Sequence, residues 1–122
     1  DHRDLHSFPT RRSSDLKPHD LFTALGYATA AAAYGFETIY LNAGSGSEHP
    51  VPPEMIRTVA EAIDAPLIVG GGLTDVEKVG AAVQAGADIV VTGSAIEHCA
   101  DIAATVGALA AAVHAVPAKE TR

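Results

Sequence analysis

Three short runs of β-forming residues in this chain each end in small residues and each lead into another segment of helical character. The runs end at Ala43–Gly46, at Gly70–Gly72 and at Gly93–Ser94. Helical patterns over 19–34, 53–63, 74–87 and 102–113 alternate with predicted strands over 38–41, 66–69 and 88–91. Such alternation is typical of an α/β fold with a parallel sheet, and uninterrupted apolar strands indicate a sheet covered on both faces.

The glycine-rich ends predict a phosphate site. The carboxyl ends of parallel strands lie at one edge, where turns and helix N-termini offer free backbone N–H groups. On this interpretation a side chain at Gly71 or Gly72 would occupy the space that the anion needs. The alternative is that the glycines serve only turns and helix packing, but three such ends in succession favour phosphate. The G-x-G-x-x-G spacing of dinucleotide-binding folds fails, because Asp75 or His49 stands at the third glycine position.

Composition excludes several other functions. The chain has 122 residues and a net charge of −7, so it fits one domain and does not resemble a nucleic-acid-binding or polybasic membrane protein. No apolar run approaches the roughly 18 residues that a membrane span needs. A single cysteine, Cys99, fits a reducing cytoplasm.

The first sixteen residues differ in kind from the rest. DHRDLHSFPTRRSSDL is polar and without period, and it matches, residue for residue, one reading frame of a common short-read sequencing adapter. We interpret residues 1–16 as an unstructured artefact; the alternative is a natural disordered arm. Residues 17–122 are then expected to be a partial domain, the C-terminal part of a longer protein.

Three segments resemble a known family. YLNAGSGSEHPVPPEM, PLIVGGGLTD and AGADIVVTGSAIE are similar, in sequence and spacing, to segments of the geranylgeranylglyceryl phosphate synthases, and the resemblance extends over residues 17–113. It implies the last three βα units, with a preceding helix, of a modified TIM (β/α)₈ barrel. It also implies a cytoplasmic, homo-oligomeric prenyltransferase that joins geranylgeranyl diphosphate to the 3-hydroxyl of sn-glycerol 1-phosphate.

The resemblance also implies roles for individual residues. Gly71 and Gly72 would donate backbone N–H groups to the phosphate, and Gly93 and Ser94 would complete the phosphate site. The residues expected to line the glycerol phosphate run from the first predicted strand into the loop after it: Tyr40, Leu41, Asn42, Ala43, Gly44, Ser45 and Gly46. Asn42 stands where the family usually has a catalytic glutamate. An amide can orient a hydroxyl but has no useful basicity, so turnover or specificity is expected to differ.

The family's Mg²⁺ ligands belong to earlier strands, so no metal ligand is expected in this chain. Glu48, His49 and Glu54 match no familiar metal-binding spacing. His98 and Cys99 are adjacent, which places them in different directions on a helix and disfavours a nucleophilic pair. Asp88 precedes its strand and would lie at the amino end of the sheet, where a charged residue usually has a structural role.

Two other functions stay open. One is another phosphate-binding barrel enzyme, such as a thiazole or thiamine phosphate synthase or a sugar-phosphate isomerase. The other is a chain that binds phosphate without catalysis, or a fragment with no independent role. In the main interpretation too, the truncated chain is expected to be inactive alone.

Overall fold

A computed structural model describes residues 20–44 and 47–117 of the chain. The interpretation of residues 1–16 as an artefact therefore lies outside the described residues. The elements follow the predicted alternation, in this order: α2 (Leu21–Ala33), β1 (Ile39–Asn42), α3 (Pro53–Ala62), β2 (Leu67–Gly70), α4 (Val76–Ala85), β3 (Ile89–Val91), α5 (Ser94–Glu97) and α6 (Ile102–His114). The short helix α5 was not predicted, because four residues carry no helical period.

Local chemistry explains where the helices begin and end. The Asp20, Asp75 and Asp101 side chains cap α2, α4 and α6 by accepting hydrogen bonds from backbone N–H groups of the first turn. Pro53 occupies the first turn of α3, where a missing N–H costs nothing. After α2 the chain turns at Gly35, whose positive φ of 91° suits glycine.

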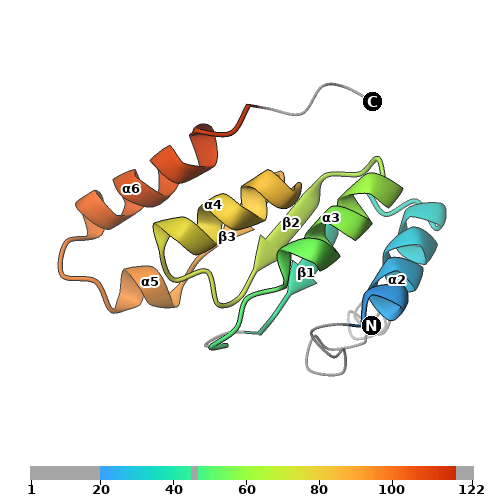
Figure 1. Ribbon diagram of the computed structural model, residues 1–122, viewed down its shortest axis with the longest axis horizontal. Helices are drawn as coiled ribbons and strands as arrows, with labels where there is room; N and C mark the ends of the chain where they lie inside the picture. Colours follow the sequence, from blue (N-terminus) through green and yellow to red (C-terminus); the bar gives the residue numbers. More distant parts are fainter. Residues whose placement is uncertain (1–19, 45–46, 118–122) are drawn as a thin grey trace, which may run out of the picture.

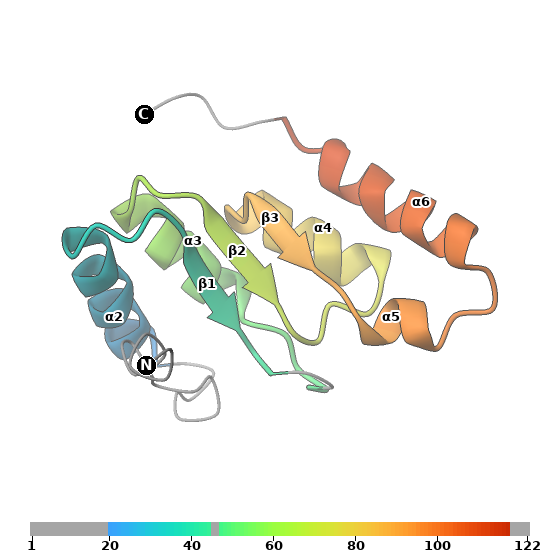
Figure 2. The same cartoon turned by 180° about the vertical axis from the view of Figure 1, so that it is seen from behind.

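The three strands form one parallel sheet in the order β1-β2-β3. Their carboxyl ends point the same way, toward the β1–α3 loop and α5 (Figure 2). Tyr40 pairs with Ile68 and Ile68 with Ile89, so that equivalent positions of the three strands lie in one row. The predicted α/β class with a parallel sheet is confirmed.

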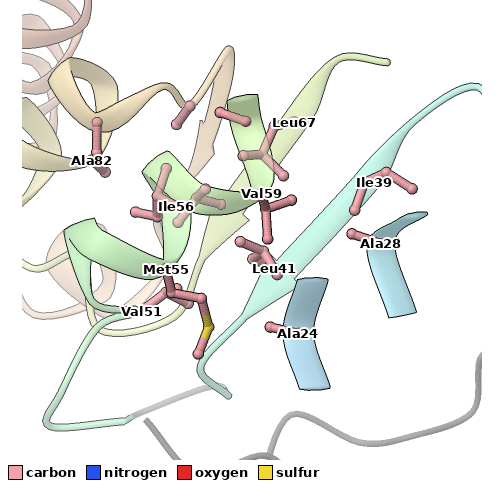
Figure 3. Close-up of a cluster of buried hydrophobic side chains, with 14 of the residues drawn as sticks. Ala24, Ala28, Ile39, Leu41, Val51, Met55, Ile56, Val59, Leu67 and Ala82 are labelled. Atoms are coloured by element: carbon pink, nitrogen blue, oxygen red, sulfur yellow. The ribbon is translucent and has the colours of Figure 1, made fainter. Parts of the chain in front are cut away.

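Helices α3 and α4 cover one face of this sheet, with α2 beside α3 and α6 beside α4 (Figure 1). The core lies under them and contains Ile56 and Val59 of α3, Leu67 and Val69 of β2, and Val79 of α4, all fully buried. Figure 3 shows Ile56, Val59 and Leu67 within this cluster. Val76 is 46% exposed, because it begins α4 at the edge of the packed layer.

The prediction that both sheet faces are covered fails for the described residues. No described helix lies over the face that Figure 2 shows, and there Ile89 and Val91 are 49% and 43% exposed. In β1 buried and exposed residues alternate strictly. The sequence did not reveal this, because the uncovered face is also largely apolar and so gives no polar alternation.

Candidate functional site

The three strand ends meet at one cavity of about 140 Å³. Its lining comes from Tyr40 and Asn42 of β1, from residues 71–74 after β2, and from Val91 and residues 92–94 around the end of β3. The parallel register brings these segments together, since Asn42 pairs with Gly70 and Gly70 with Val91. The candidate site therefore contains six of the residues predicted from the sequence: Tyr40, Asn42, Gly71, Gly72, Gly93 and Ser94.

Leu41 does not belong to this site. Its side chain is 8% exposed and lies in the core beneath α3, as Figure 3 shows. Successive side chains of a strand point to opposite faces, so Tyr40 and Asn42 can line the cavity only if Leu41 turns away from it. The prediction that Tyr40 to Gly46 line the ligand as one continuous segment is thus wrong at Leu41.

Ala43 and Gly44 take part through their backbone rather than by lining the cavity. The Ala43 N–H donates to the Gly70 carbonyl at 2.9 Å, which extends the pairing of β1 with β2. The Gly44 N–H donates to Oδ1 of Asn42 at 2.9 Å, closing a local turn at the end of β1. The next two predicted residues, Ser45 and Gly46, lie outside the described part of the chain.

Gly71 and Gly72 are required for a reason different from the one predicted. Both have positive φ, 86° and 72°. A Cβ on Gly71 would lie 2.8 Å from the backbone nitrogen and oxygen of Gly44, and a Cβ on Gly72 would lie 2.8 Å from the nitrogen of Pro50. Side chains here would therefore collide with the β1–α3 loop rather than fill the space of an anion.

Backbone N–H groups are nonetheless available at this rim. Within the described part of the chain, no backbone acceptor is found for the N–H of Gly72, Ser94 or Ala95. At α5 the first bonded donors are Ile96 and Glu97, which both donate to the Gly93 carbonyl. Unpaired N–H groups at the start of a helix and in glycine turns suit an anion.

Sequence reasoning missed four residues of the lining: Leu73, Thr74, Val91 and Thr92. The two threonines add hydroxyls to the cavity. Their signal was present, since each lies within two residues of a predicted glycine. A second, open cleft continues from Thr74 and Ser94 to Lys78, whose Nζ donates to Thr74 Oγ1 at 3.1 Å. Lys78 is paired with Asp75, whose Oδ2 lies 3.7 Å from its Nζ, and Glu48 and Glu97 line the same cleft.

The remaining candidates behave as structural groups. Across residues 20–44 and 47–117, no three His, Cys, Asp or Glu side chains gather as a metal site would require. Asp88 ties β3 to β2, since its Oδ2 accepts from the Leu67 N–H at 2.8 Å. His98 Nδ1 lies 2.9 Å from the Ser94 carbonyl and Cys99 Sγ donates to the Ile96 carbonyl, so each side chain bonds a different carbonyl oxygen.

Known proteins share this arrangement. A geranylgeranylglyceryl phosphate synthase from Thermococcus kodakarensis is 52% identical over 91 residues, which are 72% of this chain and 36% of that protein. A crystal structure of (S)-3-O-geranylgeranylglyceryl phosphate synthase from Thermoplasma acidophilum in complex with its substrate sn-glycerol-1-phosphate superposes with a TM-score of 0.80 at 38% identity, covering 83% of this chain and 41% of that one. The wild-type enzyme from Thermoplasma volcanium also has a TM-score of 0.80, with 85% and 42% covered.

The chain thus spans little more than a third of the Thermococcus relative that it matches. The sequence profile of the PcrB family matches residues 15–112, which include every strand and the whole lining of the cavity. The resemblance to geranylgeranylglyceryl phosphate synthases is confirmed by these relatives. With most of its length matched, this chain belongs to the PcrB family.

Proposed function

We propose that this chain supplies the sn-glycerol 1-phosphate site of a prenyltransferase that joins geranylgeranyl diphosphate to the 3-hydroxyl of that substrate. The observation that carries the proposal is the meeting of three strand ends at one small cavity, beside N–H groups that have no acceptor among the described residues. The Thermoplasma acidophilum relative, of matching fold over these strands, binds sn-glycerol-1-phosphate.

The cavity suits a phosphate ester on chemical grounds. Among the described residues neither lysine nor arginine lines it, so the phosphate would be held by N–H dipoles and by the hydroxyls of Thr74, Thr92 and Ser94. Lys78 lies in the adjoining cleft, paired with Asp75, and does not line the cavity. Holding the ester in this way would position its free hydroxyl for attack on an allylic carbon. Such positioning accelerates the reaction because the two reacting groups are already close together.

The sheet is proposed to be the last three βα units, with the preceding helix, of a modified TIM barrel. Helices on one face and an apolar, exposed opposite face are what a segment of barrel wall would present. The partial coverage of the relatives agrees with this proposal.

We further propose that the complete enzyme is a cytoplasmic homo-oligomer. Among the described helices, none combines the length and apolar character needed to cross a bilayer.

Mg²⁺ would neutralise the departing diphosphate in such a reaction. The described residues do not gather a ligand set for it, so no residue between 20 and 117 is assigned to the ion. We propose that its ligands belong to parts of the protein other than these described residues.

A non-catalytic phosphate-binding role is the second candidate, and Asn42 favours it. The amide cannot take a proton from the attacking hydroxyl, as a carboxylate at this position could. Binding without turnover would then be the observed behaviour.

Calorimetric titration tests the proposal on the 122-residue chain with three ligands: sn-glycerol 1-phosphate, its enantiomer sn-glycerol 3-phosphate, and inorganic phosphate. We expect sn-glycerol 1-phosphate to bind about tenfold or more tightly than either of the others, since only it satisfies both the phosphate and the chiral glycerol contacts. Equal affinities for the two enantiomers would overturn the proposed substrate. Transfer assays with geranylgeranyl diphosphate then separate turnover from binding alone.

A further inference from the structure

The loop after β1 packs against the glycine turn that follows β2, and it does so with its backbone. A Cβ on Gly71 would lie 2.8 Å from the backbone nitrogen and oxygen of Gly44. A Cβ on Gly72 would lie 3.0 Å from the carbonyl carbon of His49. The two glycines line the cavity, so the loop supports this part of the cavity wall from behind.

The side chain of Asn42 holds the start of this loop. Its Oδ1 accepts the N–H of Gly44 at 2.9 Å, an arrangement in which a short side chain takes the place of a backbone carbonyl in a turn. The N–H of Ala43, between them, donates to the Gly70 carbonyl at 2.9 Å and so ties the turn to β2. Asn42 therefore connects the sheet with the stretch of loop that contacts Gly71.

Asn42 also lines the cavity, so it can affect a ligand in two ways. Its amide can touch the ligand, or its bond to Gly44 can keep the loop in place behind the glycine turn. The second way rests on contacts that the structure contains, namely the bond from Gly44 to Asn42 and the packing of Gly44 on Gly71.

Resting on the proposed function, we infer that Asn42 is a positioning residue of the phosphate site. Its side chain fixes the loop after β1 against the Gly71–Gly72 turn, and thereby keeps the backbone of that turn in place for the anion. The role requires a short side chain with an accepting oxygen, because the bonded N–H is only two residues further along the chain. It requires no contact between Asn42 and the ligand.

Three neutral replacements separate the two ways of acting, because none of them adds charge beside an anion. Asn42→Ala removes the acceptor. Asn42→Gln keeps the amide but carries it one methylene further from the backbone, which does not suit a turn closed at the second residue. Asn42→Ser lacks the amide, but its hydroxyl oxygen can accept from the same N–H.

Calorimetric titration of the 122-residue chain with inorganic phosphate measures the effect on binding. We expect Asn42→Ala and Asn42→Gln to bind phosphate about five- to tenfold more weakly than the unaltered chain, and Asn42→Ser to stay within about threefold of it. Hydrogen exchange of the Gly44 N–H is a second readout that needs no ligand. We expect this exchange to be about tenfold faster in Asn42→Ala and Asn42→Gln than in the unaltered chain and Asn42→Ser.

Unchanged phosphate affinity in Asn42→Gln, or a loss in Asn42→Ser as large as in Asn42→Ala, would overturn the positioning role and leave the proposed function standing. Unchanged exchange of the Gly44 N–H in Asn42→Gln would do the same. Circular dichroism checks that each variant is folded, and if Asn42→Ala is not, the comparison of Asn42→Gln with Asn42→Ser decides. If the unaltered chain binds neither sn-glycerol 1-phosphate nor inorganic phosphate, both proposals fall.

Discussion

The ends of β2 and β3 look alike in the sequence but differ in the structure. After β2, Gly71 and Gly72 have positive φ and press against the backbone of the β1–α3 loop. After β3, Gly93 has a φ of −134°, and a Cβ built on it would meet nothing within 4 Å. Glycine is therefore sterically required after β2, whereas after β3 there is room for a Cβ atom.

The helices that follow these two strand ends also differ, in how their first backbone N–H groups are capped. Helix α4 begins with the Asp75 side chain accepting from the Lys78 N–H at 2.8 Å, whereas α5 begins at Gly93 with no side-chain cap. A capped helix start has used donors that an uncapped one still offers. The β2 end thus holds the loops together, whereas at the β3 end no side-chain cap competes with a ligand for the N–H groups of α5.

The largest expected effect is on stability at the β2 end. Gly71→Ala should lower the free energy of unfolding by at least about 2 kcal/mol, because a positive φ strains any other residue and the new methyl overlaps Gly44. Urea unfolding followed by circular dichroism measures the change. An unchanged midpoint would show that the two ends do not differ in this way.

Ligand binding tests the β3 end. Ser94→Ala removes a hydroxyl from the cavity and should weaken binding of inorganic phosphate about tenfold, with little change in stability. The control is Thr58→Ala, which removes a hydroxyl bonded to the Glu54 carbonyl on α3, away from the cavity. Equal affinity in Ser94→Ala and the original chain would remove this side chain from the proposed site.

The cap of α4 should matter less than the glycine contact. Asp75→Ala is expected to cost about 1 kcal/mol of stability, since it leaves the Lys78 N–H without its side-chain acceptor. Gln84→Ala, at an exposed position of the same helix, is the matched control for a general effect on α4. A loss no greater than that of the control would contradict the cap.

The smallest effect is expected at Gly93. Gly93→Ala should change the free energy of unfolding by no more than about 0.5 kcal/mol, because the added methyl meets open space at an allowed φ. Measured beside Gly71→Ala under the same conditions, it is the direct test of the contrast. Losses of similar size in the two variants would refute it.

Much of the fold could be predicted from the chain because its signals are local. The alternation of elements, the Asp75 cap and the first-turn Pro53 follow from residue types at fixed spacing. Parallel pairing then brings the three strand ends together without further information. The gathering of Tyr40, Asn42 and Ser94 at one cavity was predictable for this reason.

What could not be predicted depends on contacts between distant segments. The need for glycine at 71 arises from the approach of Gly44, 27 positions earlier in the numbering, and nothing in the local sequence reveals that distance. Leu41 was misplaced because a resemblance carried over as a continuous segment ignores the twofold period of a strand. The hydrogen bond from the Gly44 N–H to Asn42 Oδ1 likewise depends on the conformation of the turn, which the sequence does not reveal.

Gly70 has a consequence for the shape of the ligand chamber. A Cβ at this position would come within 2.5 Å of the Tyr40 phenol oxygen, so the aromatic ring reaches over the neighbouring strand only because residue 70 has no side chain. Tyr40 is one of the residues that line the cavity. Any bulkier residue at 70 would displace the Tyr40 ring. The absence of a Cβ at residue 70 therefore helps to set the depth of the cavity.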